Sequence, residues 1–437
     1  MNRTPRWEWI WLGGIIALAV AIRCWFVAGH QYIFDDSKDY LALARSILAG
    51  QEYQVHGLYA SRMPGYPILL AGLLWLRPSF AFILYAQAVM GGLCCGVLYL
   101  IGRRLSPWIG LTGAALLALD PLQIGFCAAV LSEIPFTLAL LIGLWLLTRM
   151  LTDRRLWWWL VLGFVWGVAI YLRASALWLI WPLGLTVATV WIMQGTREGE
   201  RKWHVALGRG LLGLALAWVV VLGMLYPWNT RNTARFGPHR WLTTLEGISL
   251  YEAVYPEADG GPRQDKLIVP PAIAARVGEQ AEAERNEDWM ALSKEYVRQD
   301  PGRMLRLAAV KIGRTWSPRF HAGQEGGQDA GFQNSRVQGV LLCWSILTYA
   351  LAAFGLAAQW QGHCALVGES KLRARCPCRY IVLILLPIVY FTLLHAIFIG
   401  SVRYRVPVLP VVDLLAGIGT IGLWQVVRRG WNAKSMK

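Results

Sequence analysis

Long apolar runs, separated by short clusters of arginine and lysine, dominate the sequence and restrict it to one broad class of fold. Most runs approach the ~20 residues that a helix needs to cross a bilayer, and the third is shorter. They occupy residues 9–29, 80–101, 108–119, 134–148, 157–172, 176–193, 205–226, 338–359, 380–399 and 406–427. Apolar residues make up 56% of the chain, more than a soluble protein of this length would bury. We therefore predict an all-α polytopic membrane protein with about ten transmembrane helices.

The basic residues, which give the chain a formal net charge of +16, predict which side of the membrane each loop faces. If every run spans, the clusters share one side: Arg3 and Arg6, Arg103 and Arg104, Arg149, Arg154 and Arg155, Arg197, Arg201 and Lys202, residues 371–379, and Arg428 and Arg429. By the positive-inside rule this side is the cytoplasm, and it holds both termini. The first run is as long as a span and lacks a small-residue cleavage pattern, so we predict a retained anchor rather than a signal peptide.

The other loops are predicted to lie outside the cytoplasm and to divide the chain into three parts. Residues 1–226 form an N-terminal transmembrane region with an external loop at 30–67, residues 227–337 form an external loop domain, and residues 338–437 form a C-terminal transmembrane region. Two helices are predicted in the external domain, at residues 272–299 and 303–316. The second of them is predicted to lie on the membrane surface. The apolar residues 64–78 are too few to span, so they are predicted to lie in the interface or to re-enter the membrane.

The external loop near the N-terminus carries two adjacent carboxylates, Asp35 and Asp36, directly after a predicted span. An amphipathic helix is predicted after them, with its end near Gly50. From these residues alone two interpretations stay open. The pair could supply a catalytic carboxylate, or Asp36 could cap the helix with Asp39 as its partner three residues later.

This loop resembles the first external loop of the GT-C polytopic glycosyltransferases, in particular of the protein O-mannosyltransferases and the lipid A aminoarabinose transferases. The resemblance rests on a spanning helix, an acidic motif, the run YLALARSILAGQEY and the run RMPGYP. It implies a GT-C-like bundle with interfacial helices and a small external domain. It also implies that an Asp of this loop is the catalytic residue, and that Arg62, before the proline-rich turn, binds the phosphate of the lipid carrier.

The spacing of the family motif selects one of the two aspartates. In the family the catalytic Asp is followed by Glu and has a Tyr four positions after it. Counting back from Tyr40 selects Asp36, although Ser37 stands where the family has Glu. Asp36 is therefore the preferred catalytic residue, and Asp35 is the alternative.

Further charged residues at the outer ends of spans fit the chemistry of sugar transfer from a polyprenyl phosphate. This reaction needs one group to take a proton from the acceptor, and cations where the departing phosphate gathers charge. It needs no second carboxylic acid, because phosphate leaves as a stable anion. The candidates for substrate or phosphate binding are Arg62, Glu133, Arg173, Arg231, Arg403, Tyr404 and Arg405. Each arginine could instead be an interfacial anchor, and Glu133 a helix-start charge.

The same resemblance bears on several of these candidates. The runs YPWNTRN and RYRVPVLP are similar to motifs that open the family's large external domain and its last span, which supports Arg231, Arg403 and Arg405. Glu133 looks like the acidic residue of the family's second external loop, where it could line the substrate cavity or bind a divalent cation. No residue is assigned as a metal ligand.

The cysteines predict no external disulfide, because Cys127 alone among the eight lies near the outer face. Four potential zinc ligands, His363, Cys364, Cys376 and Cys378, share one cytoplasmic loop. Their CPC spacing is not that of a standard finger, so free thiols are favoured over a metal site.

The sequence thus predicts an integral protein of the inner cell membrane that transfers a sugar, with inversion, from a polyprenyl-phosphate donor to an acceptor outside the cytoplasm. The acceptor would be a lipid, a glycan or a protein, and no nucleic acid is involved. The alternative is a multi-pass secondary transporter. Transporters place ionisable residues near the bilayer midplane and often have two related halves, whereas here the charges lie at span ends and no halves are apparent.

Overall fold

The structure is a computed structural model that describes residues 6–197, 203–237, 240–262, 267–276, 281–320, 334–360 and 377–435. These residues fold almost entirely into helices, with two isolated β-bridges and no strand among them. The His363, Cys364 and Cys376 positions lie outside the described residues, and so does the side chain of Cys378. The preference for free cysteine thiols over a zinc site in this loop therefore stays a prediction.

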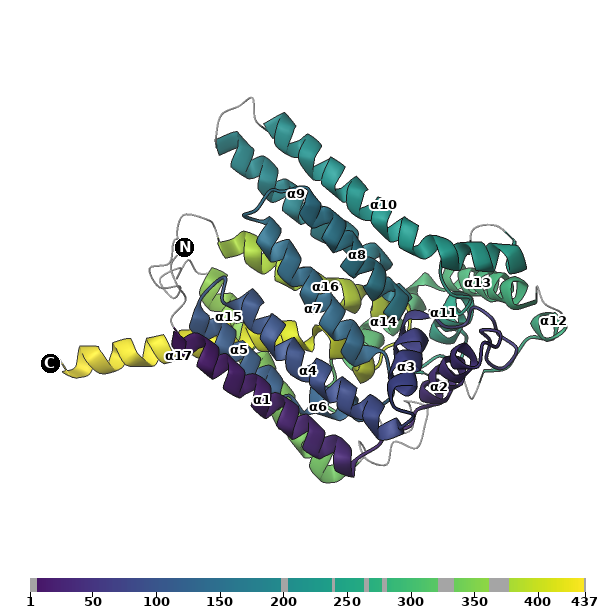
Figure 1. The fold of residues 1–437 in the computed structure, drawn as a ribbon, viewed down its shortest axis with the longest axis horizontal. Helices are drawn as coiled ribbons and strands as arrows, with labels where there is room; N and C mark the ends of the chain where they lie inside the picture. The colour runs from purple at the N-terminus through teal and green to yellow at the C-terminus, as the bar shows by residue number, and fades with distance from the viewer. Residues whose placement is uncertain are drawn as a thin grey trace.

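A bundle of long apolar helices forms the body of the molecule (Figure 1). Within the described residues, eight helices are long and apolar enough to cross a membrane, or nine if α5 and α6, bent by 55°, count as one span. The members of the bundle are α1 (Arg6–Gly29), α4 (Phe80–Gly102), α5 (Pro107–Leu119), α6 (Pro121–Cys127), α7 (Glu133–Met150), α8 (Trp157–Leu172), α9 (Ile180–Arg197), α10 (Trp203–Phe236), α15 (Ser335–Trp360), α16 (Pro377–Ile397) and α17 (Leu409–Ser435). The predicted span at 157–172 is α8, which is apolar but shorter than a span, so eight or nine candidates stand against the ten predicted. The prediction of an integral, multi-pass membrane protein is confirmed.

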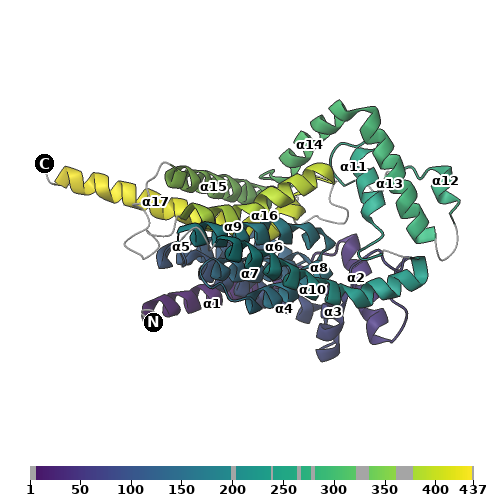
Figure 2. The ribbon, with the colours of Figure 1, turned by 90° about the horizontal axis from the view of Figure 1, so that it is seen from above.

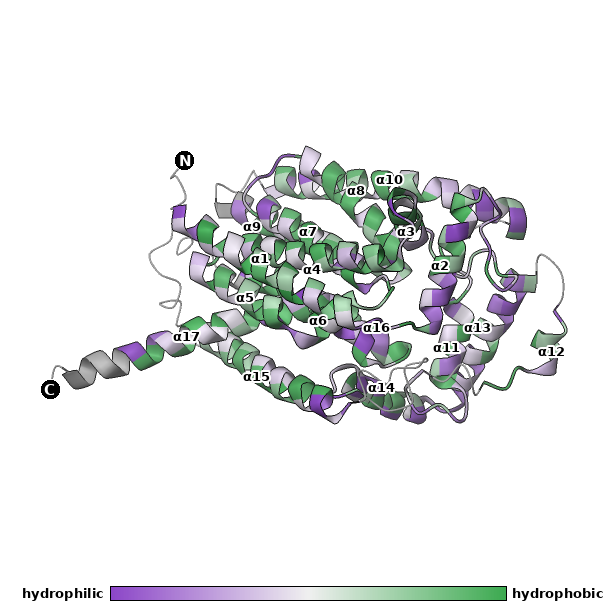
Figure 3. Cartoon of the chain, turned by 60° about the horizontal axis from the view of Figure 1, so that its bottom comes forward, coloured by the Kyte–Doolittle hydropathy of each residue, from purple (hydrophilic) through white to green (hydrophobic). Residues whose placement is uncertain are grey.

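Large apolar side chains cover the outside of this bundle, as expected for helices that face lipid. Trp25 is 74% exposed and Val219 is 65% exposed, and both lie on helices that qualify as spans. Figure 3 shows that hydrophobic residues run along the bundle while hydrophilic residues gather at its ends.

Small residues let the spanning helices approach one another closely, which is the usual basis of helix packing in lipid. The pair α15 and α17 is the clearest case. A Cβ on Gly419 would lie 1.9 Å from the carbonyl oxygen of Leu351, and one on Gly355 would lie 2.7 Å from that of Leu415. Both positions therefore require glycine at this helix contact.

The elements that carry the candidate site lie together at one end of the bundle, which we call the loop end. They are α2 (Asp35–Leu48), α3 (Gly65–Leu76), the 3-10 helix η1 (Ala174–Leu179), α11 (Glu246–Val254), α12 (Pro271–Ala274), α13 (Ala281–Gln299), α14 (Pro301–Thr315) and the 3-10 helix η6 (Val402–Val408). The first turn of α1 and the last turn of α17 lie at the opposite end (Figure 1). Figure 2 shows α11, α13 and α14 grouped beyond the loop end of α16.

Several predicted boundaries are confirmed at this end. The predicted amphipathic helix is α2, and Gly50 follows it with φ of 63°. The apolar segment at 64–78 is the 12-residue helix α3. Asp300 separates α13 from α14 and caps α14 by accepting a hydrogen bond from the backbone N of Arg303 (2.8 Å).

One boundary lies elsewhere. The predicted end of a span at residue 226 falls inside α10, which contains Pro227 and continues to Phe236. The end of this helix therefore projects among the elements of the loop end. A proline can be accommodated inside a long membrane helix when neighbouring groups satisfy the freed backbone.

Candidate active site

The start of α2 places the acidic pair in the first helical turn rather than at the cap. The N-cap residue is Phe34, whose backbone N donates a hydrogen bond to Oγ of Ser37 (3.1 Å). Asp36 is therefore not the N-cap, and the capping alternative is wrong. A carboxylate in the first turn still interacts favourably with the helix dipole.

Both carboxylate oxygens of Asp36 are bound by arginines from distant parts of the chain. Oδ1 accepts from Nη2 of Arg62 at 2.5 Å, and Oδ2 accepts from Nη1 of Arg403 at 2.6 Å. Arg62 comes from the loop before α3, and Arg403 comes from η6, 367 residues after Asp36. The same Nη2 of Arg62 also contacts Oδ2 of Asp39 at 3.0 Å, one helical turn along α2.

Arg403 links Asp36 to a second, fully buried carboxylate. Its Nε donates to Oε1 of Glu133, at the start of α7, and Nη1 of Arg173 donates to the same oxygen at 2.7 Å. Glu133 is 0% exposed, and its Oε2 has no hydrogen-bond partner. The structure thus joins Asp36, Asp39, Glu133, Arg62, Arg173 and Arg403 into one network, which we call the charge cluster.

The arginines decide the protonation state of Asp36. Burial would raise the pKa of this carboxyl, but Arg62 and Arg403, with Arg173 further away, hold its pKa well below the usual range. Burial would lower the pKa of Arg62, and Asp36 and Asp39 instead raise it. Asp36 is therefore ionised at neutral pH, and as long as both arginines hold it, it is a weak base.

Four of the predicted site residues, Asp35, Arg231, Tyr404 and Arg405, are not members of the charge cluster. Asp35, whose side chain is 70% exposed, faces away from the cluster and pairs with Lys38 at 2.8 Å. Arg405 is buried on another side of η6 and donates to the carbonyl oxygens of Thr315 and Ser317. A 3-10 helix has about three residues per turn, so Arg403 and Arg405, two positions apart, cannot project in the same direction. Arg405, a candidate for phosphate binding, therefore lies apart from Arg62 and Arg403.

Arg231 also binds backbone rather than the cluster. Its Nη1 donates to the carbonyl oxygen of Tyr59 at 2.9 Å, and its Nη2 donates to that of Tyr53 at 2.8 Å. Tyr53 in turn donates its hydroxyl to the carbonyl oxygen of Arg62 at 3.1 Å. Arg231 thus stabilises the loop between α2 and α3, which positions Arg62.

A buried carboxylate of α13 fastens the same loop from the other side. Glu282, which is 4% exposed, accepts hydrogen bonds from the backbone N of Tyr59 (2.5 Å) and of Ala60 (2.9 Å). The hydroxyl of Thr244 also donates to it. Nothing in the sequence near Glu282 pointed to this role, because the two backbone groups that it holds, at Tyr59 and Ala60, lie more than 200 positions earlier in the chain.

Tyr404 lies beside the cluster and brings in a residue that the sequence analysis missed. Its ring stacks on that of His395, with 4.2 Å between centroids and 2° between planes. The guanidinium carbon of Arg173 lies 5.8 Å from the Tyr404 ring centroid. His395 is the last histidine of the chain and sits near the end of α16, but no motif around it singled it out.

The described residues contain no group of three or more His, Cys, Asp and Glu side chains placed to hold a metal ion. In the charge cluster, guanidinium groups contact both oxygens of Asp36 and one oxygen of Glu133. The cluster therefore fits an anionic ligand, which arginine binds well, better than it fits a cation.

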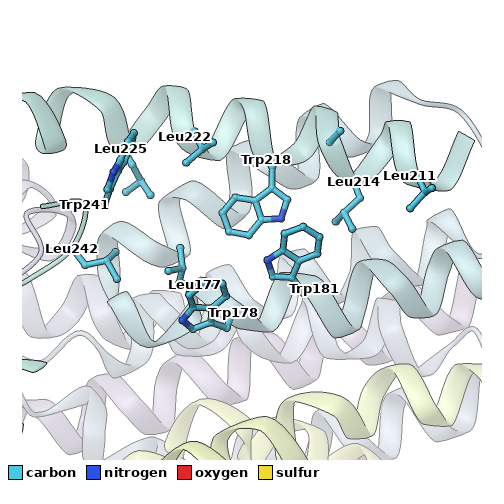
Figure 4. A pocket seen from close by; sticks show the side chains of 11 residues that line it. Leu177, Trp178, Trp181, Leu211, Leu214, Trp218, Leu222, Leu225, Trp241 and Leu242 are labelled. Atoms are coloured by element: carbon cyan, nitrogen blue, oxygen red, sulfur yellow. The ribbon is translucent and has the colours of Figure 1, made fainter. Parts of the chain in front are cut away.

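An apolar groove of about 670 Å³ opens between α9 and α10, near the loop end (Figure 4). Its lining side chains are Leu177, Trp178, Trp181, Leu211, Leu214, Ala215, Trp218, Leu222, Leu225, Trp241 and Leu242. Leu177 lies in η1, which directly follows Arg173. The carbonyl oxygen of Leu242 accepts from Nε1 of Trp228, in the same stretch of α10 as Arg231. The groove thus begins close to the elements that carry the charge cluster.

Comparisons with known proteins show which family model and which solved structures this chain resembles. Residues 63–223 match the family model of the dolichyl-phosphate-mannose-protein mannosyltransferases. The match contains Glu133 and Arg173, and it begins just after Arg62, so it does not reach Asp36. No match was found among curated protein sequences.

The fold is similar to that of the oligosaccharyltransferase from Archaeoglobus fulgidus. The apo form of that enzyme superposes with a TM-score of 0.54 at 12% identity, over 98% of this chain and 52% of the archaeal one. A structure of the same enzyme in complex with an inhibitory peptide and a dolichol-phosphate gives a TM-score of 0.50 at 11% identity, over 99% and 52%. This chain thus spans about half the length of the archaeal enzyme. The GT-C glycosyltransferase fold predicted from the sequence is confirmed.

Proposed function

We propose that this chain, which has the GT-C fold, is a membrane glycosyltransferase that moves a sugar from a polyprenyl-phosphate carrier to an acceptor outside the cytoplasm. Asp36 takes the proton from an acceptor hydroxyl as the acceptor oxygen bonds to the anomeric carbon. The bond between that carbon and the phosphate oxygen breaks, and its electron pair leaves on the phosphate. Attack from the face opposite the leaving group inverts the configuration.

The observation that carries this proposal is the charge cluster, in which one part-exposed carboxylate lies between two arginines. A departing phosphate needs nearby cations, and the forked donors of arginine suit its geometry. Arg62, Arg173 and Arg403 are the residues we assign to the phosphate, with Tyr404 beside them. Arg231 and Glu282 are positioning residues, because they act through the loop that carries Arg62.

The apolar groove between α9 and α10 supports a lipid-linked donor. A polyprenyl chain has no polar atoms, and the groove presents leucine and tryptophan side chains from η1, α9, α10 and the segment that follows α10 (Figure 4). Its proximity to η1 would leave a phosphate at the head of the chain close to Arg173. The archaeal relative was determined with a dolichol-phosphate, which is a carrier of this chemical kind.

The positive-inside rule supports placing the charge cluster and residues 227–337, as an external domain, on the extracytoplasmic face of the inner membrane. We expect a cysteine introduced at Ile268, which is 76% exposed, to react with a membrane-impermeant maleimide in intact cells. A cysteine at Arg155, whose side chain is 72% exposed between α7 and α8, should react only after permeabilisation. The protein without an introduced cysteine is the control, since it measures the background labelling of the native cysteines. The opposite pattern would put the cluster on the cytoplasmic face and contradict the proposed site of reaction.

The direct test of the function is donor turnover by the purified protein in lipid nanodiscs. A polyprenyl-phosphate mannose is a suitable first probe, since the matched family model is that of the dolichyl-phosphate-mannose-protein mannosyltransferases. Polyprenyl-phosphate pentoses are the next probes, and membrane extracts supply candidate lipid, glycan and protein acceptors. We expect release of polyprenyl phosphate that depends on the acceptor. Saturable uptake of a solute by proteoliposomes, with no consumption of any donor, would instead favour the transporter alternative.

A further inference from the structure

We propose that the carrier phosphate enters the site by exchanging places with Asp36 on Arg62, so that binding of the donor releases the carboxylate that serves as the base. This inference rests on the proposed function and adds an order of events to it. In the structure, the ion pair with Arg62 occupies one oxygen of Asp36 and weakens this carboxylate as a base. The donor therefore binds before the acceptor can be deprotonated.

The first argument is the charge balance of the cluster. Three carboxylates, Asp36, Asp39 and Glu133, face three guanidinium groups, and every one of these guanidinium groups contacts at least one carboxylate. A phosphate brought into this balanced cluster adds negative charge without any unpaired guanidinium to receive it. Since like charges close together are strongly unfavourable at a part-buried site, one carboxylate must give up an arginine.

The second argument is that Asp36 can leave Arg62 and still have its charge balanced by Arg403. Glu133 is 0% exposed, and two arginines contact one of its oxygens. Moving Glu133 would therefore leave buried charges without a partner. The side chain of Asp36 is 24% exposed, the largest exposed fraction among the three carboxylates, with Asp39 at 18%. Asp36 lies in the first turn of α2, where a free carboxylate remains favourable because of the helix dipole.

The third argument is that Arg62 can change partners without losing its own position. It contacts Asp39 at 3.0 Å as well as Asp36, and its guanidinium carbon lies 5.6 Å from the ring centroid of Tyr40. Its Nε is buried and has no hydrogen-bond partner. Two phosphate oxygens, one accepting from Nε and the other from a terminal nitrogen, would satisfy this donor through the two-pronged geometry that arginine favours.

The chemical consequence follows from the electrostatics. Arg62 and Arg403 hold the pKa of Asp36 well below its usual range, which suits tight pairing but makes a poor base. The other charged groups around it are Asp39 on its own helix, Arg173 before η1, and Glu133 on α7. Once a phosphate draws Arg62 away and adds its own negative charge, one of the two direct causes that lower the pKa of Asp36 is removed, and this pKa rises. The base is then strengthened only when a donor is present.

The experiment compares the affinity of three variants for polyprenyl phosphate in nanodiscs. The exchange requires wild-type protein to break an ion pair before the phosphate binds, whereas Asp36→Asn has no such pair to break. We expect Asp36→Asn to bind polyprenyl phosphate at least tenfold more tightly than wild type. Asp35→Asn, which changes an exposed carboxylate outside the cluster, should bind like wild type.

Asp39→Asn separates exchange from simple charge repulsion. It removes the same charge from the cluster but leaves the ion pair between Asp36 and Arg62 intact, so we expect it to tighten binding clearly less than Asp36→Asn does. Equal tightening by Asp36→Asn and Asp39→Asn would overturn the exchange and leave only general repulsion. Unchanged or weaker binding by Asp36→Asn would overturn it as well. If the wild type does not bind polyprenyl phosphate at all, both this inference and the proposed function are overturned. Adding inorganic phosphate as a competitor shows whether the protein recognises the phosphate head group or the lipid chain.

Discussion

Asp36→Asn is expected to lower the rate of sugar transfer on the order of a hundred- to ten-thousand-fold, which is the usual cost of losing a general base. The substitution keeps the size of the side chain and removes its ability to take a proton. It leaves α2 intact, because the N-cap is Phe34 and the capping contact comes from Ser37. Arg62 retains Asp39 and Arg403 retains Glu133, so neither arginine is left unpaired.

The measurement is transfer of labelled sugar by protein that elutes as a single species in detergent and has the wild-type melting temperature. Asp35→Asn serves as the matched control, since it makes the same chemical change one residue away at an exposed position. We expect this control to keep most of the activity. Transfer by Asp36→Asn at close to the wild-type rate would refute the assignment of the base, and an inactive Asp35→Asn would show that the count back from Tyr40 selects the wrong neighbour.

The spans were predictable because membrane insertion leaves a local signal. A helix must cross about 30 Å of hydrocarbon with its backbone satisfied internally, so length and apolar character are enough to find it. The short α8 and α5 were also found in this way, whereas α6, the second half of the bent pair, was not. The extension of α10 past Pro227 was not, because proline usually marks the end of a helix.

The site was predictable as a set of residues but not as an arrangement. The sequence showed arginines at the ends of spans, and it could not show which of them share a cluster. Arg403 and Glu133 are 270 positions apart, and their contact depends on how α7 and η6 pack. Arg405 shows the limit most clearly, since the local 3-10 geometry turns it toward Ser317 and away from Asp36.

Glu133→Gln is expected to destabilise the protein by on the order of 3–5 kcal/mol, the usual cost of breaking a buried ion pair from one side. Glu133 is fully buried, and Arg403 and Arg173 both donate to its Oε1. A neutral amide there removes the charge that balances two part-buried cations. The free energy of unfolding in mixed detergent micelles measures the loss. The matched control is Glu287→Gln, since Glu287 is 63% exposed and pairs with Arg240, and we expect it to lose less than about 1 kcal/mol.

A double variant shows whether the cost comes from the unbalanced charge or from lost packing. In Glu133→Gln combined with Arg173→Gln, the cluster keeps Asp36, Asp39, Arg62 and Arg403, and its charges balance again. We therefore expect the two losses to be less than additive, with a coupling on the order of 0.5–3 kcal/mol. Strictly additive losses would mean that Arg173 and Glu133 stabilise the fold independently. In that case the charge cluster would not be one network, and neither the assignment of Arg173 to the phosphate nor the balance that underlies the exchange at Asp36 would hold.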